Sequence, residues 1–199
     1  MIAVELIKTD LFESSSYLIR RKILKLLGAA FHIYKPDGTL AFYSRMKAFK
    51  LKEDIRLYTD ESMATEVLVI KARQILDFSA AYDVVDPATG EKVGALKRKG
   101  LKSMVRDEWM LMDAHDVEIG LLEEDSLLLA LLRRFLSGLI PQTYKGKIGN
   151  AHVCTFKRNF NPFVSKIVID FSPDTGKLLD KRLGLAASVL LCATEGKQH

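Results

Sequence analysis

The stretch "DKRLGLAASVLLCATEG" (residues 180–196) decides the fold, because it admits only two structural interpretations. Every side chain between Arg182 and Glu195 is apolar or small, so a helix here has no polar face. At about 1.5 Å per residue, the apolar part (183–193) covers roughly 16 Å, about half the hydrocarbon thickness of a bilayer. It is too short to span a membrane, so a helix of this composition must be enclosed by protein.

Small residues and end signals complete this prediction. Asp180 is suited to cap the start of the helix, and Gly196 is suited to follow its end. Small side chains keep the helix thin and let β-strands approach its axis closely; they belong to Gly184, Ala186, Ala187 and Ser188. A helix at the centre of a β-barrel fits both the apolar surface and the small girth.

Most of the remaining chain has the pattern of short strands separated by turns, with β-branched and aromatic residues between Gly, Pro and Asp clusters. The turns "KPDG" (35–38), "DPATG" (86–90) and "DAHD" (113–116) predict three hairpins. Further strands are predicted at 66–73, 150–158 and 165–172. Residues 17–27 fit a basic amphipathic helix or a strand, and the strand-rich context favours a strand. A long antiparallel sheet tends to close into a barrel, which removes its edges.

A second apolar segment, "DSLLLALLRRFLSG" (125–138), has the signals of another helix. Asp125 or Ser126 can cap its start, Gly138 can end it, and Pro141 prevents its continuation. We therefore expect a fold of β-strands with two helices, one of them central.

Composition indicates a single domain over residues 1–199 in a reducing compartment. The chain is 48% hydrophobic and 28% charged, and its length is sufficient for a sizeable core. Cys154 and Cys192 form no C-x-x-C pair, so neither a disulfide framework nor a thiolate zinc site is indicated. Glu5 and Asp10 lie where a signal peptide needs a basic end and an apolar stretch. We expect a soluble cytoplasmic protein without a transmembrane span.

Four segments, taken in order, resemble one known family: "GEKVGALKRKGLKSMVRDEWML" (90–111), "EEDSLLLALLRRFL" (123–136), "IPQTYKG" (140–146) and the stretch 180–196. Together they are similar to the LURP-one-related proteins, which are grouped with phospholipid scramblases and tubby C-terminal domains. The resemblance covers most of the chain, from about Phe31 to the C-terminus. It implies an all-β fold with helices, a closed antiparallel barrel of about twelve strands around a hydrophobic C-terminal helix.

The strongest local charge signal is "KRKGLKSMVR", a run of cations without an acid on a chain whose net charge is only +5. In a strand, Lys97 and Lys99 share one face while Arg98 takes the other. The run is a candidate site for anionic head groups, and a solvated hairpin is the alternative. Interleaved aromatic residues that would stack on bases are missing, which disfavours nucleic acid. The candidate residues are Lys97, Arg98, Lys99, Lys102 and Arg106.

Catalytic and metal sites have only weak candidates. Asp170, Ser172 and Asp174 have part of the spacing of a calcium loop, but the loop glycine is one place late and Lys181 stands where the loop needs a bidentate Glu. His152 and Cys154 are predicted to share one face of a strand, without a further ligand or base at a recognisable spacing. The sequence therefore predicts no enzyme activity, no catalytic residue, no metal and no cofactor.

The predicted function is a binding or scaffold role. The resemblance to a superfamily that includes phosphoinositide-binding tubby domains suggests weak, peripheral binding of acidic phospholipids at a membrane surface. Two alternatives stay open. One is a scramblase-like lipid-handling protein, and the other is a structural module that binds an unknown protein partner and has no affinity for anions.

Overall fold

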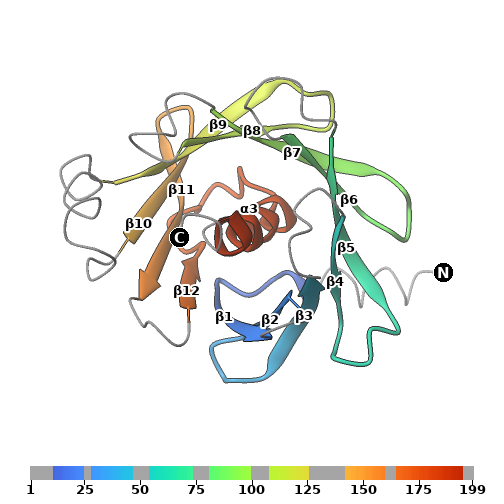
Figure 1. Cartoon of the computed structure of the whole chain (residues 1–199). Helices are drawn as coiled ribbons and strands as arrows, with labels where there is room; N and C mark the ends of the chain where they lie inside the picture. The colour runs from blue at the N-terminus through green and yellow to red at the C-terminus, as the bar shows by residue number, and fades with distance from the viewer. Residues whose placement is uncertain are drawn as a thin grey trace.

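The computed structural model describes residues 11–24, 28–46, 54–73, 81–99, 108–125, 142–159 and 165–194. These residues form twelve strands and one helix (Figure 1). The strands are β1 (Ser16–Leu24), β2 (Gly28–Tyr34), β3 (Leu40–Met46), β4 (Ile55–Tyr58), β5 (Glu66–Ala72), β6 (Ala81–Val85), β7 (Lys92–Arg98), β8 (Glu108–Met112), β9 (Glu118–Glu124), β10 (Gln142–Ile148), β11 (Ala151–Asn159) and β12 (Ser165–Asp170). The helix is α3 (Lys181–Thr194).

The strands form one closed antiparallel barrel in which each strand pairs with its neighbours in sequence. The barrel closes where β12 returns to β1, with a register that runs from Ser16 opposite Asp170 to Arg21 opposite Ser165. Closure gives every strand two hydrogen-bonded neighbours and leaves no open edge. The predicted barrel is confirmed, with twelve strands.

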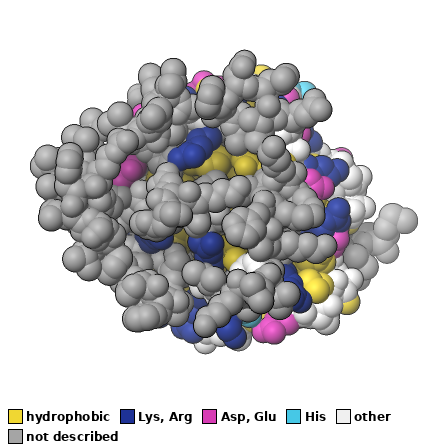
Figure 2. Space-filling view, in the orientation of Figure 1, with side chains coloured by type: hydrophobic (Ala, Val, Ile, Leu, Met, Phe, Trp, Pro, Cys, Tyr) yellow, Lys and Arg dark blue, Asp and Glu magenta, His cyan; other side chains and the backbone are white. Residues whose placement is uncertain are grey.

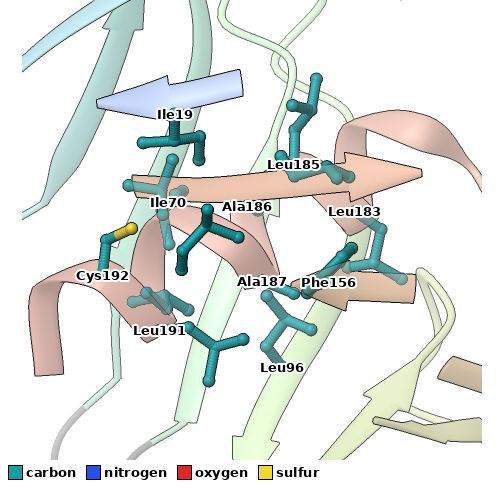
Figure 3. Close-up of a cluster of buried hydrophobic side chains, with 14 of the residues drawn as sticks. Ile19, Ile70, Leu96, Phe156, Leu183, Leu185, Ala186, Ala187, Leu191 and Cys192 are labelled. Carbon is teal, nitrogen blue, oxygen red and sulfur yellow. The ribbon is translucent and has the colours of Figure 1, made fainter. Parts of the chain in front are cut away.

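Helix α3 lies inside the barrel, as the sequence predicts (Figure 1). Leu185 and Leu191 are fully buried, and Ala187 is only 2% exposed. Figure 3 shows side chains of Ile19, Ile70, Leu96 and Phe156, which come from four different strands, clustered with those of the helix. Within the described residues, no helix combines the length and apolar character needed to cross a bilayer.

Glycines allow the helix and the wall to approach each other. A Cβ added at Gly184 would lie 2.4 Å from Cε1 of Phe171, which is closer than two carbon atoms can pack. A Cβ added at Gly94 on β7 would lie 2.6 Å from the carbonyl oxygen of Met112 and 3.2 Å from a methyl group of Leu183. The small residues of the helix and of the wall are therefore matched, and the interior is filled by side chains.

The loop between β12 and α3 is held by two carboxylates. Asp174 accepts hydrogen bonds from the backbone N–H groups of Leu178 (2.9 Å) and Leu179 (2.8 Å). Asp180 accepts one from the N–H of Arg182 at 2.9 Å, which is the predicted N-cap. These bonds set the angle at which α3 enters the barrel.

The hairpin turns and the strand assignment of residues 17–27 are confirmed where the structure describes them. Gly38 and Gly90 have φ of +85° and +75°, and the Asp113 carboxylate accepts the N–H groups of His115 and Val117. β4 and β10 are the strands that the sequence pattern does not single out. β4 has only four residues, and β10 carries lysines on alternate positions around a glycine. The expected helix at 125–138 and the predicted C′ position of Gly196 lie outside the described residues.

Candidate functional site

The described part of the predicted basic cluster does not form one patch. Lys97 is exposed on the outer face of β7, whereas Arg98 alternates with Leu96, which is fully buried, and therefore points to the inner face. Nζ of Lys99 lies 4.0 Å from a carboxylate oxygen of Glu118. Lys97 and Arg98 therefore lie on different faces of β7. Lys102 and Arg106 lie outside the described residues.

The weak calcium candidate has its carboxylates engaged by the backbone. Asp170 accepts a hydrogen bond from the N–H of Ser172 at 2.9 Å, and both oxygens of Asp174 accept the N–H bonds of the β12–α3 loop. Within the described residues, no group of three or more His, Cys, Asp or Glu side chains is placed to hold a metal ion. These acids have a structural role in the turn that leads into α3.

The prediction that His152 and Cys154 share a face is wrong. Lys147 pairs with His152 and the adjacent Gly146 pairs with Cys154, so Val153 is an extra residue in β11 and forms a β-bulge. The bulge leaves His152 exposed and Cys154 fully buried. Burial raises the pKa of the Cys154 thiol to about 12, so the thiolate is not formed at neutral pH.

A second set of cations gathers on the outer face of β11, β12, β1 and β2, where sequence reasoning missed it. Arg20 on β1 lies opposite Lys166 on β12, and on its other side it lies opposite His32 on β2. Ile19 precedes Arg20 and Ile167 follows Lys166 in sequence, and both isoleucines are buried in the core, so Arg20 and Lys166 point outward. We call this set the basic face; its members are Arg20, Lys22, Lys35, Lys157 and Lys166.

The cations of the basic face form no ion pair with a described acid, unlike several cations elsewhere on the wall. Within the described part of the chain, no ion pair joins any of them to an Asp or Glu. Around the rest of the wall, Lys145 pairs with Asp125 and Lys147 pairs with Glu123, each at 3.0 Å. A larger network joins cations and acids across β6, β7 and the β8–β9 turn; it consists of Arg73, Asp83, Lys92 and Asp116.

An apolar groove runs through the basic face. It has a volume of about 340 Å³ and contains Leu18, Tyr34 and Val168 among its lining residues, together with Arg20 and Lys35. The Arg20 guanidinium lies 5.0 Å from the centre of the Tyr34 ring. Leu18 and Val168 are opposite each other in the register of β1 and β12, and Val168 is 45% exposed. None of the described residues that line this groove is acidic.

A larger cleft of about 460 Å³ lies at the end of the barrel where α3 begins. Two of its three basic side chains, those of Lys181 and Arg182, are already engaged. Arg182 contacts the carboxylates of Asp180 at 2.7 Å and Asp86 at 3.4 Å. Lys181 donates a hydrogen bond to the carbonyl oxygen of Glu13 at 2.7 Å. Five acidic residues also line this cleft, which disfavours an anion there: Glu13, Asp86, Glu91, Asp174 and Asp180. The basic face, in contrast, has cations that no described acid engages in an ion pair.

The described part of the surface seen in Figure 2 carries charges of both signs. In Figure 2, Lys and Arg side chains are spread around the view and do not gather in one patch. The grouping of the basic face is therefore a property of particular strands and does not follow from the net charge. Its residues are separated by up to 146 positions in sequence, from Arg20 to Lys166, and only the closure of the barrel between β12 and β1 brings them together.

Comparison with known proteins assigns no family to this chain. No family model matches it, and no curated protein or solved structure does so either. The resemblance to LURP-one-related proteins therefore stays a prediction, and function has to be inferred from the residues of the barrel.

Proposed function

We propose that this chain is a non-catalytic binding protein that recognises acidic phospholipid head groups, phosphoinositides before nucleic acid, at a membrane surface facing the cytoplasm. The observation that carries the proposal is a group of outward cations that make no ion pair with a described acid, on a wall where several other cations, such as Lys145 and Lys147, are paired. Like charges that lie side by side without counter-charges attract anions, and phosphate groups accept hydrogen bonds from Lys and Arg.

The filled interior directs this proposal to the outside of the barrel. A barrel of this size can enclose a ligand, but here the interior is occupied by α3. Ala186 and Val189 in the helix are fully buried, and Phe156 in the wall is only 1% exposed. A ligand therefore binds on the outer wall or at the ends of the barrel.

Weak and salt-sensitive binding follows from the number of cations. Each Lys or Arg near an anionic surface contributes about 1 kcal/mol, so about four engaged side chains give affinities in the millimolar range. Nucleic acid is disfavoured as the anion near β7, because Trp109 is only 1% exposed and cannot stack on a base. The resemblance to tubby-like proteins supports phosphoinositides as the preferred head groups.

Co-sedimentation with liposomes at low salt tests the proposal. Wild-type protein should sediment with vesicles that contain phosphatidylinositol 4,5-bisphosphate or phosphatidylserine, and less with pure phosphatidylcholine. The charge-reversed hairpin K97E/K99E/K102E/R106E tests the cluster that the sequence nominates. Equal binding to acidic and neutral vesicles by the wild type refutes the proposal and favours a protein-interaction module. Calcium-dependent lipid flipping in reconstituted vesicles indicates a scramblase-like activity instead.

A further inference from the structure

The described cations of the hairpin, on β7, and the cations of the basic face lie on opposite sides of the barrel. In the order of strands around the wall, β7 is six positions from β1 in a barrel of twelve, which is half of the circumference (Figure 1). A flat bilayer that lies along the side of the barrel contacts only one of them. The choice between the hairpin near Lys97 and the basic face is therefore a choice of orientation.

We propose that the basic face lies against an anionic bilayer, with Leu18 and Val168 reaching the membrane interface between the cations. This inference rests on the proposed function, because it names the surface through which acidic head groups are bound. It is a docking surface across four strands and does not involve the barrel interior.

The first support is the arrangement of charges. Arg20 and Lys166 are directly opposite each other on adjacent strands, where Cβ atoms are about 5 Å apart and like charges repel. Neither side chain has an acidic partner within the described residues. Acids near the basic face have other contacts: Asp37 and Asp170 accept backbone N–H bonds from Thr39 and Ser172, and Glu61 contacts His32 at 3.0 Å. Hydrogen bonds from Thr39 lower the pKa of the Asp37 carboxyl, and of the cations on this face Lys35 lies close enough to lower it further. A phosphate that bridges the two cations removes the repulsion.

The second support is the apolar surface between the cations. Four large apolar side chains are exposed among the described residues, and Val168 is the one that lies within a strand. It has Lys157 opposite it on β11 and Leu18 opposite it on β1. A soluble polyanion neutralises the cations but leaves these side chains in water. A bilayer supplies phosphates for the cations and an apolar boundary for Val168 and Leu18, so it fits both features.

The hairpin offers less to a bilayer where it is described. Arg98 points to the inner face, and Lys99 lies near Glu118. This leaves Lys97 as the outward cation that no described acid pairs with. Ala95, which precedes Lys97 by two residues and lies on the same face of β7, is fully buried. The described part of β7 therefore presents no exposed apolar side chain beside its cation.

Matched charge reversals test the orientation. The full chain is sedimented with vesicles of equimolar phosphatidylserine and phosphatidylcholine at low salt. We expect R20E/K166E to lose about 30-fold or more in partition coefficient, the factor expected when two membrane-facing cations are lost. The control K71E/K177E changes the net charge equally, but Lys71 lies on β5 and Lys177 lies in the β12–α3 loop. It should bind within about threefold of wild type, because it keeps the basic face.

A single neutral change separates binding from folding. Lys166→Gln removes the like-charge pair, so it should leave the melting temperature unchanged or raise it while it weakens vesicle binding. If Lys166→Gln lowers the melting temperature and vesicle binding in parallel, the loss of binding reflects a loss of folding, and the role of Lys166 at the membrane is contradicted. This readout also covers the case in which R20E/K166E does not fold.

Val168→Ser separates a bilayer from a soluble phosphate. It should weaken vesicle binding several-fold and leave the binding of free inositol hexakisphosphate unchanged. Val117→Ser, at a residue 58% exposed in the β8–β9 turn, is the matched control and should change neither.

Unchanged vesicle binding of Val168→Ser, or full binding of R20E/K166E, overturns this orientation. If R20E/K166E binds fully while the hairpin variant K97E/K99E/K102E/R106E does not, acidic head-group binding stands and the docking surface is the hairpin. A wild type that does not distinguish acidic from neutral vesicles refutes the proposed function itself, and the docking surface with it.

Discussion

A charge placed at Ala187 should unfold the protein at neutral pH. Ala187 lies in the middle of α3, is 2% exposed, and has apolar neighbours from the helix and the wall (Figure 3). An Asp there finds no counter-charge, so its pKa rises by about 3–5 units. At pH 7 this costs about 4 kcal/mol, from about 1.4 kcal/mol for each of the roughly three pH units above the unfolded pKa of about 3.9, and overpacking adds about 1–3 kcal/mol. The sum is comparable to the whole stability of a typical domain, about 5–15 kcal/mol.

The matched variant Ala187→Asn isolates the charge, because Asn has nearly the same shape and does not titrate. The carboxyl of Ala187→Asp has a folded pKa raised above its unfolded value of about 3.9. It is therefore neutral in both states below pH 3.9 or so, and its destabilising effect grows as pH rises towards the folded pKa. The difference in unfolding free energy between the two variants should widen over this range. Ala64→Asp, at an exposed turn position, is the control and should change stability by less than about 0.5 kcal/mol.

Urea unfolding followed by tryptophan fluorescence provides the assay, since Trp109 is the single tryptophan and is 1% exposed. Far-UV circular dichroism reports whether Ala187→Asp is folded at all at pH 7. A variant with the wild-type midpoint at pH 7, or with the same pH dependence as Ala187→Asn, refutes a helix enclosed in the core.

Three further predictions concern the ends and the wall of the barrel. Asp180→Ala removes the N-cap of α3 and the partner of Arg182, and should lower the unfolding free energy by about 1–2 kcal/mol in urea titrations. Cys154 and Cys192 are fully buried, so native protein should not react with a thiol reagent at neutral pH, and both thiols should react once urea unfolds the chain. Desolvation alone raises the pKa of Asp83, but hydrogen bonds from its cationic partners outweigh it and lower the pKa below the ordinary value. The ionised form of Asp83 therefore stabilises the fold above about pH 3.9, and this contribution is lost as the pH falls through the lower folded pKa. The difference in unfolding free energy between wild type and Asp83→Asn should shrink over the same fall in pH.

Local patterns in the sequence are sufficient for most of the fold. The all-round apolar surface of residues 183–193 places the helix in the core, and Gly38 and Gly90 mark turns because their φ values are positive. The sequence pattern does not single out β10 as a strand, because Gly146 weakens the alternation of its residues. That glycine is required where a Cβ would lie 2.3 Å from the sulfur of Cys154. The bulge at Val153 also has no signature in the sequence, and it separated His152 from Cys154.

The candidate surfaces differ in how far sequence reasoning reaches. The cluster at Lys97 is visible because its cations are contiguous, and the alternation of its faces follows from strand geometry. The basic face is not visible, because Arg20 and Lys166 become neighbours only through the register of β1 and β12. That no described acid forms an ion pair with them depends in turn on which strands flank them. A search for cations at alternating positions of the first and last predicted strands, once closure is assumed, could have found it.

A fluorophore on the basic face measures most directly whether an anionic bilayer lies against it. Because both native cysteines are buried, Val168→Cys and Val117→Cys can each be labelled at one site with an environment-sensitive dye. On addition of phosphatidylserine vesicles, the label at residue 168 should shift to the blue and become protected from an aqueous quencher, while the label at residue 117 should not change. A shift at residue 117 alone, or at neither position while the protein sediments with the vesicles, contradicts docking through the basic face.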